Sequence, residues 1–552
     1  MNVAEYKEFD GLGLADLVAS GEVNATELLD AALKAIERDN PAINAAISNL
    51  ELLARKPVEQ GLPDGPLREV PFLMKDDEFL VEGTTSTPSC RLLESWTANH
   101  DSTLTGRFRQ AGLNIVGMTN VPELAQQPTT EPLLRGPTRN PWDTNRSAGG
   151  SSGGAAAAAT AGLVPIAHAT DGEGSTRIPA SCCGLVGLKP SRGRNPSGPD
   201  RFTLAGGTIC PHVLTRTVRD TALVLDAVCG PDTGDPTICP PPVEAFRDWV
   251  GLPPEPLRIA VAAEPPEGLS LDREVDTSFS KGCHLLESLG HHVEPTHPNL
   301  DTRRLMNAFF DVCSADRWLF LHRVAAVLGH TIRASGFEPT TWDFLQRGAS
   351  VSGEAYIDAI NVFNAPSRTM GTFHEEWDLI LSPTMASIPP PLGRMSSGDP
   401  MAVARREMTA FAPIANITGQ PSISLPLGRT EDNLAVGMMF TAAIGREDTL
   451  LRIAGQLEAA APLPRLAPPK ADRKTGWPEV WMSSSRNENF LALVPQTLDG
   501  GRADRNHPVP ARNLPQRGMG RLSNCGLVIG RSLDVNVVVY NESEGNCANL
   551  FD

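Results

Sequence analysis

The chain has 552 residues, of which 41% are hydrophobic and 20% charged, enough apolar material for a large buried core. Its formal net charge of −17 argues against a surface that binds nucleic acid or anionic membrane, so small neutral or cationic partners are favoured. A chain of this length forms either roughly two to four domains or one large α/β unit.

The opening residues, MNVAEYKEFDG, lack a basic segment followed by an apolar run, and no stretch approaches the roughly 18 consecutive apolar residues of a membrane span. We therefore expect no secretory signal, no membrane contact and a cytoplasmic location. The 10 cysteines show neither C-x-x-C nor paired Cys/His spacing, which favours buried free thiols over disulfides or a zinc site. We expect no metal and no cofactor.

The first long element is predicted to be a helix. In residues 23–42, VNATELLDAALKAIERDNPA, Asn24 and Glu27 have the spacing of a capping box ahead of an apolar stripe. The helix is expected to end near Pro41.

A short apolar strand is predicted at residues 70–74, and Lys75 follows at its mouth. Beyond it, helical and strand patterns alternate, which predicts a large α/β fold with helices covering a mainly buried sheet. The segments that carry this alternation are 102–112, 113–120, 153–162, 163–169, 257–263, 274–290, 377–383, 421–428, 435–443 and 448–460.

A change of composition marks the end of the main domain. Residues 461–478, APLPRLAPPKADRKTGWP, are rich in proline and polar groups, so residues 1–475 are assigned to one domain and 476–552 to a C-terminal extension. The extension is expected to be flexible or peripheral, with NVVVY as a lone strand.

Two serines lie in glycine-rich frames, Ser151 in GGSSGG and Ser175 in DGEGS. A phosphate-binding loop is disfavoured, because the G-x-x-x-x-G-K-[ST] pattern and a nearby cation are missing. Ser151 also fits the G-x-S-x-G pattern of a hydrolase elbow, but the segment before it, RNPWDTNRSA, is typical of a loop and not of a strand. The nearest histidine, His168, lies in an apolar run that predicts a buried strand.

A third interpretation uses both serines and a lysine. A buried neutral lysine is able to take the proton of a serine hydroxyl, directly or through a second hydroxyl, and Lys75 at the end of an apolar strand is the candidate. The glycine-rich turn around Ser175 offers consecutive backbone N–H groups for a developing oxyanion.

These motifs resemble those of the amidase signature family. TDGEGSTRIPASCCGLVGLKPSRGR is close to the family pattern D-x-G-G-S-[IVT]-R-x-P-A-x-x-x-G-x-x-G-L-K-P, and VPFLMKD, VGMTNVPELA, RNPWD, WDLILSPT, NITGQPSISLPLG and GREDTLL match in order. The resemblance covers roughly residues 10–460, with a signature core at about 65–230. It implies the amidase-signature α/β fold, with a large mixed, mainly buried central sheet covered by helices on both faces, and it implies hydrolysis of C–N bonds.

Carried over, the resemblance implies that Ser175 is the acyl-forming nucleophile and that Ser151, preceded by a cis peptide from Gly150, is the bridging serine. Lys75 becomes the base that later acts as acid. The oxyanion hole comes from backbone N–H groups, those of Gly172, Glu173, Gly174 and Ser175.

Three further side chains have supporting roles by resemblance. Asp171 and Arg177 brace the loop, and Ser152 forms a hydrogen bond near the lysine or, alternatively, caps the helix that follows it. Glu173 stands where the family usually has glycine, so we expect its carboxylate to point away from the oxyanion site, towards Arg177 or a cationic substrate group. Met118, which replaces a frequent lysine, is interpreted as structural.

The substrate is expected to be a small amide, anilide or carbamate. AQQPTTEPLLRGPTRNPWD is most similar to the branch that includes 6-aminohexanoate cyclic-dimer hydrolase, and FFDVCSADRW around Cys313 is faintly similar to it. A cysteine in such a position is more often a buried core thiol than a substrate contact, so Cys313 is the weaker candidate for substrate binding. A homodimer remains open.

Alternatives are the glutaminase subunit of a transfer-RNA amidotransferase, a non-catalytic scaffold, or a Ser-His-Asp esterase. The last would need a histidine, and the cluster His284, His291 and His292 is predicted to lie on solvated surface.

Overall fold

The computed structural model describes residues 1–201, 203–396, 400–462 and 466–467, and three short strands near the C-terminus. The chain divides into two units, residues 1–471 and 472–552. The predicted boundary after residue 475, and the predicted flexible or peripheral character of the extension, lie outside the described residues. The NVVVY segment is not a lone strand, because β13 (Val537–Tyr540) pairs with β12 (Gly526–Ile529) and β14 (Cys547–Ala548).

One mixed sheet organises the first unit, where the described residues supply eleven strands in the order β1-β3-β2-β4-β6-β5-β10-β11-β9-β7-β8. In chain order the strands are β1 (Ala46–Asn49), β2 (Pro71–Lys75), β3 (Asn114–Thr119), β4 (Ile166–Asp171), β5 (Val186–Lys189), β6 (Cys210–Thr215), β7 (Arg258–Val261), β8 (His292–Pro295), β9 (Leu379–Pro383), β10 (Ser422–Arg429) and β11 (Ala435–Ala442).

Pairing directions in the sheet are mixed. Strand β2 runs parallel to β3 and β4, whereas β4 and β5 pair antiparallel with β6. Strands β10 and β11 form an antiparallel pair that joins β5 on one side to β9 on the other, and β7 runs parallel to β8 and β9. The α/β fold with a mixed sheet is therefore confirmed.

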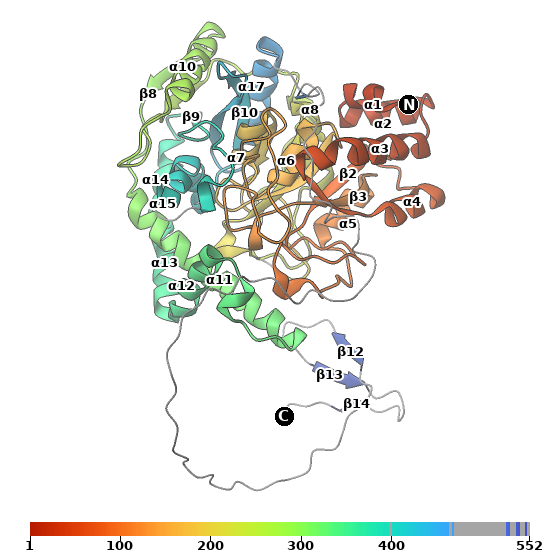
Figure 1. Ribbon diagram of the computed structural model, residues 1–552. Coiled ribbons are helices and arrows are strands. Elements are labelled where there is room, and N and C mark those ends of the chain that lie inside the picture. The colour runs from red at the N-terminus through yellow and green to blue at the C-terminus, as the bar shows by residue number, and fades with distance from the viewer. Residues whose placement is uncertain are drawn as a thin grey trace, which may run out of the picture. The chain divides into compact units, whose positions relative to one another are not determined.

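Helices cover both faces of the sheet, as expected (Figure 1). Successive residues of β2 show the two faces: Phe72 and Met74 pack in a core with Leu28 of α3, whereas Leu73 packs in a second core with the alanines of α6. The α-helices are α1 (Val3–Glu8), α2 (Gly11–Ser20), α3 (Ala25–Ile43), α4 (Glu51–Gln60), α5 (Thr103–Gln110), α6 (Gly153–Thr160), α7 (Arg177–Cys183), α8 (Val218–Val228), α9 (Phe246–Trp249), α10 (Arg273–Ser288), α11 (Thr302–Leu328), α12 (Pro339–Ser350), α13 (Gly353–Val362), α14 (Asn364–Phe373), α15 (Pro400–Met408), α16 (Pro413–Thr418) and α17 (Glu447–Ala460).

Local predictions hold with small shifts. The capping box of Asn24 and Glu27 is present, but α3 continues past Pro41 to Ile43, because the chain leaves the helix only at Asn44, which adopts a left-handed conformation. The strand predicted at residues 70–74 is β2, which includes Lys75. Within the described residues, no helix combines the length and apolarity needed to cross a bilayer.

Candidate active site

Lys75 is the last residue of β2, and its side chain is fully buried. Its Nζ lies 2.8 Å from Ser151 Oγ and 2.7 Å from Thr170 Oγ1, and the Asp77 carboxylate is 3.8 Å away. Burial lowers the pKa of Lys75 to about 8, because the charged ammonium is poorly solvated there, while Asp77 and Asp171 oppose the drop. The strand thus delivers an amine of which about one tenth is neutral at pH 7.

Thr170 and Asp77 hold this amine, and neither was selected from the sequence. Thr170 Oγ1 donates a hydrogen bond of 2.8 Å to Asp77 Oδ2, so its lone pairs are left to accept from Lys75. Burial raises the pKa of Asp77 to about 6, with Lys75 opposing the rise. Their positions in the sequence were the available signals: Asp77 comes two residues after Lys75, and Thr170 is the next-to-last residue of the buried strand β4 (Ile166–Asp171).

Ser151 follows a cis peptide bond from Gly150, which confirms that expectation. A side chain at Gly150 would meet the backbone of Thr129 at 2.6 Å, so glycine is required there. Ser152 precedes α6 but makes no side-chain capping bond. Its Oγ instead donates to the carbonyl of Thr170 at 3.3 Å, so of its two predicted roles the structure shows the contact near the lysine.

Ser175 lies in the loop that follows β4. Its carbonyl accepts from the Ser152 backbone N–H at 3.2 Å, which ties the two serine loops together. Gly174 has a φ of 116°, and a Cβ there would lie 2.7 Å from Ala412 Cβ, so this position needs glycine. The Gly174 N–H donates to Asp171 Oδ1 at 2.7 Å, which commits one of the four predicted oxyanion donors to the loop itself.

Asp171 and Arg177 form a fully buried, two-pronged ion pair, with both nitrogen–oxygen distances at 2.9 Å. The Arg177 guanidinium holds the pKa of Asp171 well below its usual range despite burial. Asn416 of α16 completes the group, since its Nδ2 donates to Asp171 Oδ1 at 2.9 Å and its Oδ1 accepts from Arg177 at 2.5 Å. Asn416 lies in a matched motif, but no local signal marked it as a site residue.

Glu173 points towards Arg405 of α15, with which it forms an ion pair. The expectation of Arg177 as its partner is wrong, because Arg177 is already occupied by Asp171 and Asn416. Glu173 also has no positive φ, so the side chain at this position costs no backbone strain.

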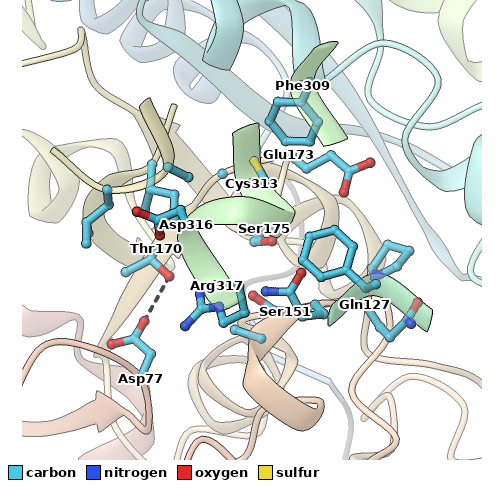
Figure 2. A pocket seen from close by; sticks show the side chains of 18 of the residues that line it. Asp77, Gln127, Ser151, Thr170, Glu173, Ser175, Phe309, Cys313, Asp316 and Arg317 are labelled. Atoms are coloured by element: carbon cyan, nitrogen blue, oxygen red, sulfur yellow. Dashed lines mark hydrogen bonds between the residues drawn. The ribbon is translucent and has the colours of Figure 1, made fainter. Parts of the chain in front are cut away.

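One pocket joins these elements. Ser151, Ser175 and Glu173 line it, and Figure 2 shows them with Cys313 and Arg317 of α11. Apolar side chains form much of the remaining wall, those of Phe79, Ile178, Leu204, Ile209, Phe309, Phe310 and Phe344.

A family model described as amidase matches residues 27–451, a range that contains every residue of this site. The chain belongs to the amidase signature family. It is a hydrolase of amide bonds.

Over 470 residues this amidase is 36% identical to a 6-aminohexanoate-cyclic-dimer hydrolase of Paenarthrobacter ureafaciens, with 82% of this chain and 95% of the relative covered. A solved structure of 6-aminohexanoate cyclic dimer hydrolase complexed with substrate matches with a TM-score of 0.77 at 34% identity, covering 82% of this chain and 97% of that one. A bacterial aryl acylamidase matches with a TM-score of 0.76 at 25% identity, covering 82% and 96%.

The histidines weighed for a Ser-His-Asp triad, namely His168, His284, His291 and His292, are not among the residues that line this pocket. His284 and His292 are exposed as predicted, but His291 is buried, because Nδ1 accepts from the Leu257 backbone N–H at 3.1 Å and Nε2 lies 2.9 Å from Gln456 Oε1. His168 is buried in β4, and burial lowers its pKa far below the usual range.

Two further predictions, for Met118 and Cys313, can be compared with the structure of the amidase. Met118 is a buried residue of β3, in agreement with a structural role. Cys313 is a partly buried free thiol that lines the pocket, with its Sγ 4.0 Å from Thr208 Oγ1, and burial raises the pKa of its thiol. Among the residues that the structure describes, no group of His, Cys, Asp and Glu is arranged to hold a metal.

Proposed function

We propose that this amidase hydrolyses small amides, anilides or carbamates through an acyl-enzyme on Ser175, with Ser151 and Lys75 moving the proton. The observation that carries the proposal is the buried Lys75 amine, 2.8 Å from Ser151 Oγ, in a pocket wall that Ser151 and Ser175 share. A serine hydroxyl becomes a useful nucleophile only when a base accepts its proton, and an amine of lowered pKa meets that need.

In the first half-reaction, Ser175 Oγ bonds to the carbonyl carbon while its proton passes to Ser151 Oγ, and the Ser151 proton passes to Lys75 Nζ. The carbonyl oxygen becomes an oxyanion facing the N–H groups of Gly172, Glu173 and Ser175. Lys75 then returns a proton through Ser151 to the substrate nitrogen, the C–N bond breaks, and the amine leaves.

In the second half-reaction, water takes the place of the amine. Lys75 accepts a proton from the water through Ser151, the resulting hydroxide bonds to the acyl carbon, and the ester bond to Ser175 breaks as the serine recovers its proton. From an amide or anilide the products are a carboxylic acid and an amine, and from a carbamate they are a carbonic acid half-ester and an amine. The lysine ends neutral, ready for another cycle.

The pocket wall and the relatives support the proposed substrate class. An apolar wall with phenylalanines on α11 favours aliphatic or aromatic groups around the scissile carbonyl. The names of the relatives, a hydrolase of a cyclic aliphatic amide and an aryl acylamidase, support aliphatic amides and anilides.

The test is hydrolysis of a chromogenic anilide and a carbamate by the purified single chain, beside Ser175→Ala and Lys75→Ala. A sulfonyl fluoride, followed by mass spectrometry, identifies the nucleophile. We expect both variants to be inactive and the adduct to form on Ser175 in the wild type. The matched control is Ser288→Ala, an exposed serine of α10 whose hydroxyl bonds only its own helix at Leu285, and it should retain full activity.

Four results would overturn the proposal. An adduct on another residue, or turnover retained by Ser175→Ala, would remove Ser175 as nucleophile. Glutamine hydrolysis that appears only with a partner subunit would favour the amidotransferase role, and a wild type without turnover or adduct would favour a non-catalytic scaffold.

A further inference from the structure

Arg405 of α15 contacts three of the segments that line the pocket. Its guanidinium pairs with Glu173 on the loop after β4 and donates to the Gln126 carbonyl at 2.9 Å and to Gln127 Oε1 at 3.0 Å. It also lies 5.5 Å from the ring centre of Phe310 on α11. These four partners come from three segments far apart in the sequence, and the Arg405 side chain connects them.

The Glu173 carboxylate, which is mostly buried, has Arg405 as its ion-pair partner. The two side chains are 15% and 20% exposed, so water screens them only partly. Glu173 Oε1 is buried without a hydrogen-bond partner among the described residues, and burial raises the pKa of Glu173 while Arg405 opposes the rise. Among the described residues, Arg405 is therefore the cation that pairs with this carboxylate and favours its charged form.

The nucleophile loop is held from its inner side by a different group. Asp171 accepts from the N–H groups of Gly174 and Thr176, at 2.7 and 3.1 Å, and from Arg177. Glu173 lies between these anchored residues, and its side chain points outward to α15. Its backbone N–H is one of the donors that the proposed function assigns to the oxyanion.

We propose that Glu173 and Arg405 are a positioning pair, which fixes the Glu173 backbone N–H for the developing oxyanion and ties the nucleophile loop to the opposite pocket wall. The inference rests on the proposed function. Neither side chain touches the reacting atoms. The pair acts through the direction of an N–H group, whose benefit is realised mainly in the transition state.

The experiment measures kcat and KM for a small anilide with Glu173→Gln, Arg405→Met and the double variant. Glu173→Gln keeps the shape of the side chain but removes the charge that Arg405 holds, so we expect kcat to fall about 10- to 100-fold and KM to change less than about threefold. If the two residues act as one unit, the double variant should be no slower than the slower single variant.

A pair of ketones separates positioning from general damage. A trifluoromethyl ketone adds the Ser175 hydroxyl across its carbonyl and presents an oxyanion to the hole, whereas the methyl ketone of the same skeleton binds mainly as a ground-state mimic. We expect Glu173→Gln to weaken the fluorinated ketone by the same factor as kcat/KM and the methyl ketone by less than about twofold. Only folded enzyme binds either ketone, so poor folding cannot imitate this result.

The matched control is Arg406→Ala, which removes the neighbouring arginine of α15, an exposed side chain that donates to the Glu267 carbonyl. It should leave both ketones unaffected. Loss confined to KM, equal weakening of both ketones, or additive losses in the double variant would overturn the positioning pair. Turnover that survives Ser175→Ala would instead contradict the proposed function and, with it, the inference.

Discussion

The clearest consequence of the Lys75 environment is the pH dependence of kcat/KM. In the proposed mechanism the lysine acts as base only when it is neutral, and its pKa is lowered from 10.5 to about 8 by burial. The neutral fraction therefore rises from about one tenth at pH 7 to about nine tenths at pH 9. We expect kcat/KM to increase about tenfold over this interval and then to level off, whereas a lysine with an ordinary pKa would give a rise of about 100-fold that continues beyond pH 10.

The assay is release of the coloured aniline at constant ionic strength, measured at closely spaced pH values from 6 to about 10. Asp77→Asn provides an internal check, because the Asp77 carboxylate, 3.8 Å from Lys75 Nζ, supports the ammonium and raises its pKa. Removing that charge should move the inflection about one unit or more towards lower pH. An inflection outside pH 7 to 9 in the wild type, or one that Asp77→Asn leaves unmoved, would refute the assignment of Lys75 as the base.

Three substitutions test the support of the site. Lys75→Met should abolish turnover yet stabilise the fold at pH 7 by up to about 3 kcal/mol, because keeping a lysine of depressed pKa protonated in the folded state costs that much below pH 8. The resulting gain in thermal unfolding temperature should shrink as the pH rises from 8 to 10.5. Asp171→Asn leaves the Arg177 guanidinium buried without its anion, so denaturant unfolding should show a loss of about 3–5 kcal/mol, and a loss below 1 would contradict this. Gly174→Ala should inactivate the enzyme, because its Cβ would meet Ala412 at 2.7 Å at a φ of 116°, and wild-type turnover in this variant would show that the loop adapts.

The sequence was informative wherever chemistry and chain neighbourhood coincide. An apolar strand that ends in Lys75 and a serine in a glycine frame are local patterns, and the structure brings Lys75 and Ser151 within hydrogen-bond distance. The alternation of helical and strand patterns likewise predicted the α/β class. Strand order was beyond reach, because β10 and β11 insert between β5 and β9 through pairings that no local pattern specifies.

The missed residues depend on distant contacts or on ambiguous local signals. Arg405 lies 232 residues from Glu173, and Asn416 lies 245 from Asp171, so only the folded sheet brings them together. Ser152 precedes a helix as a capping serine would, and its bond to the Thr170 carbonyl becomes evident only when the two loops meet. His291 follows a helix end and reads as surface, yet the adjoining β7 and α17 bury it.

The place of β10 and β11 in the sheet also determines when the sheet is completed during synthesis. Strands β7 and β9 join the earlier strands only through this pair, and α15 and α16, which carry Arg405 and Asn416, come directly before it in the chain. A nascent chain on the ribosome therefore holds Lys75, Ser151 and Ser175 long before it holds the strands that complete the sheet behind them. That sheet is complete only once synthesis has passed residue 442, the last residue of β11.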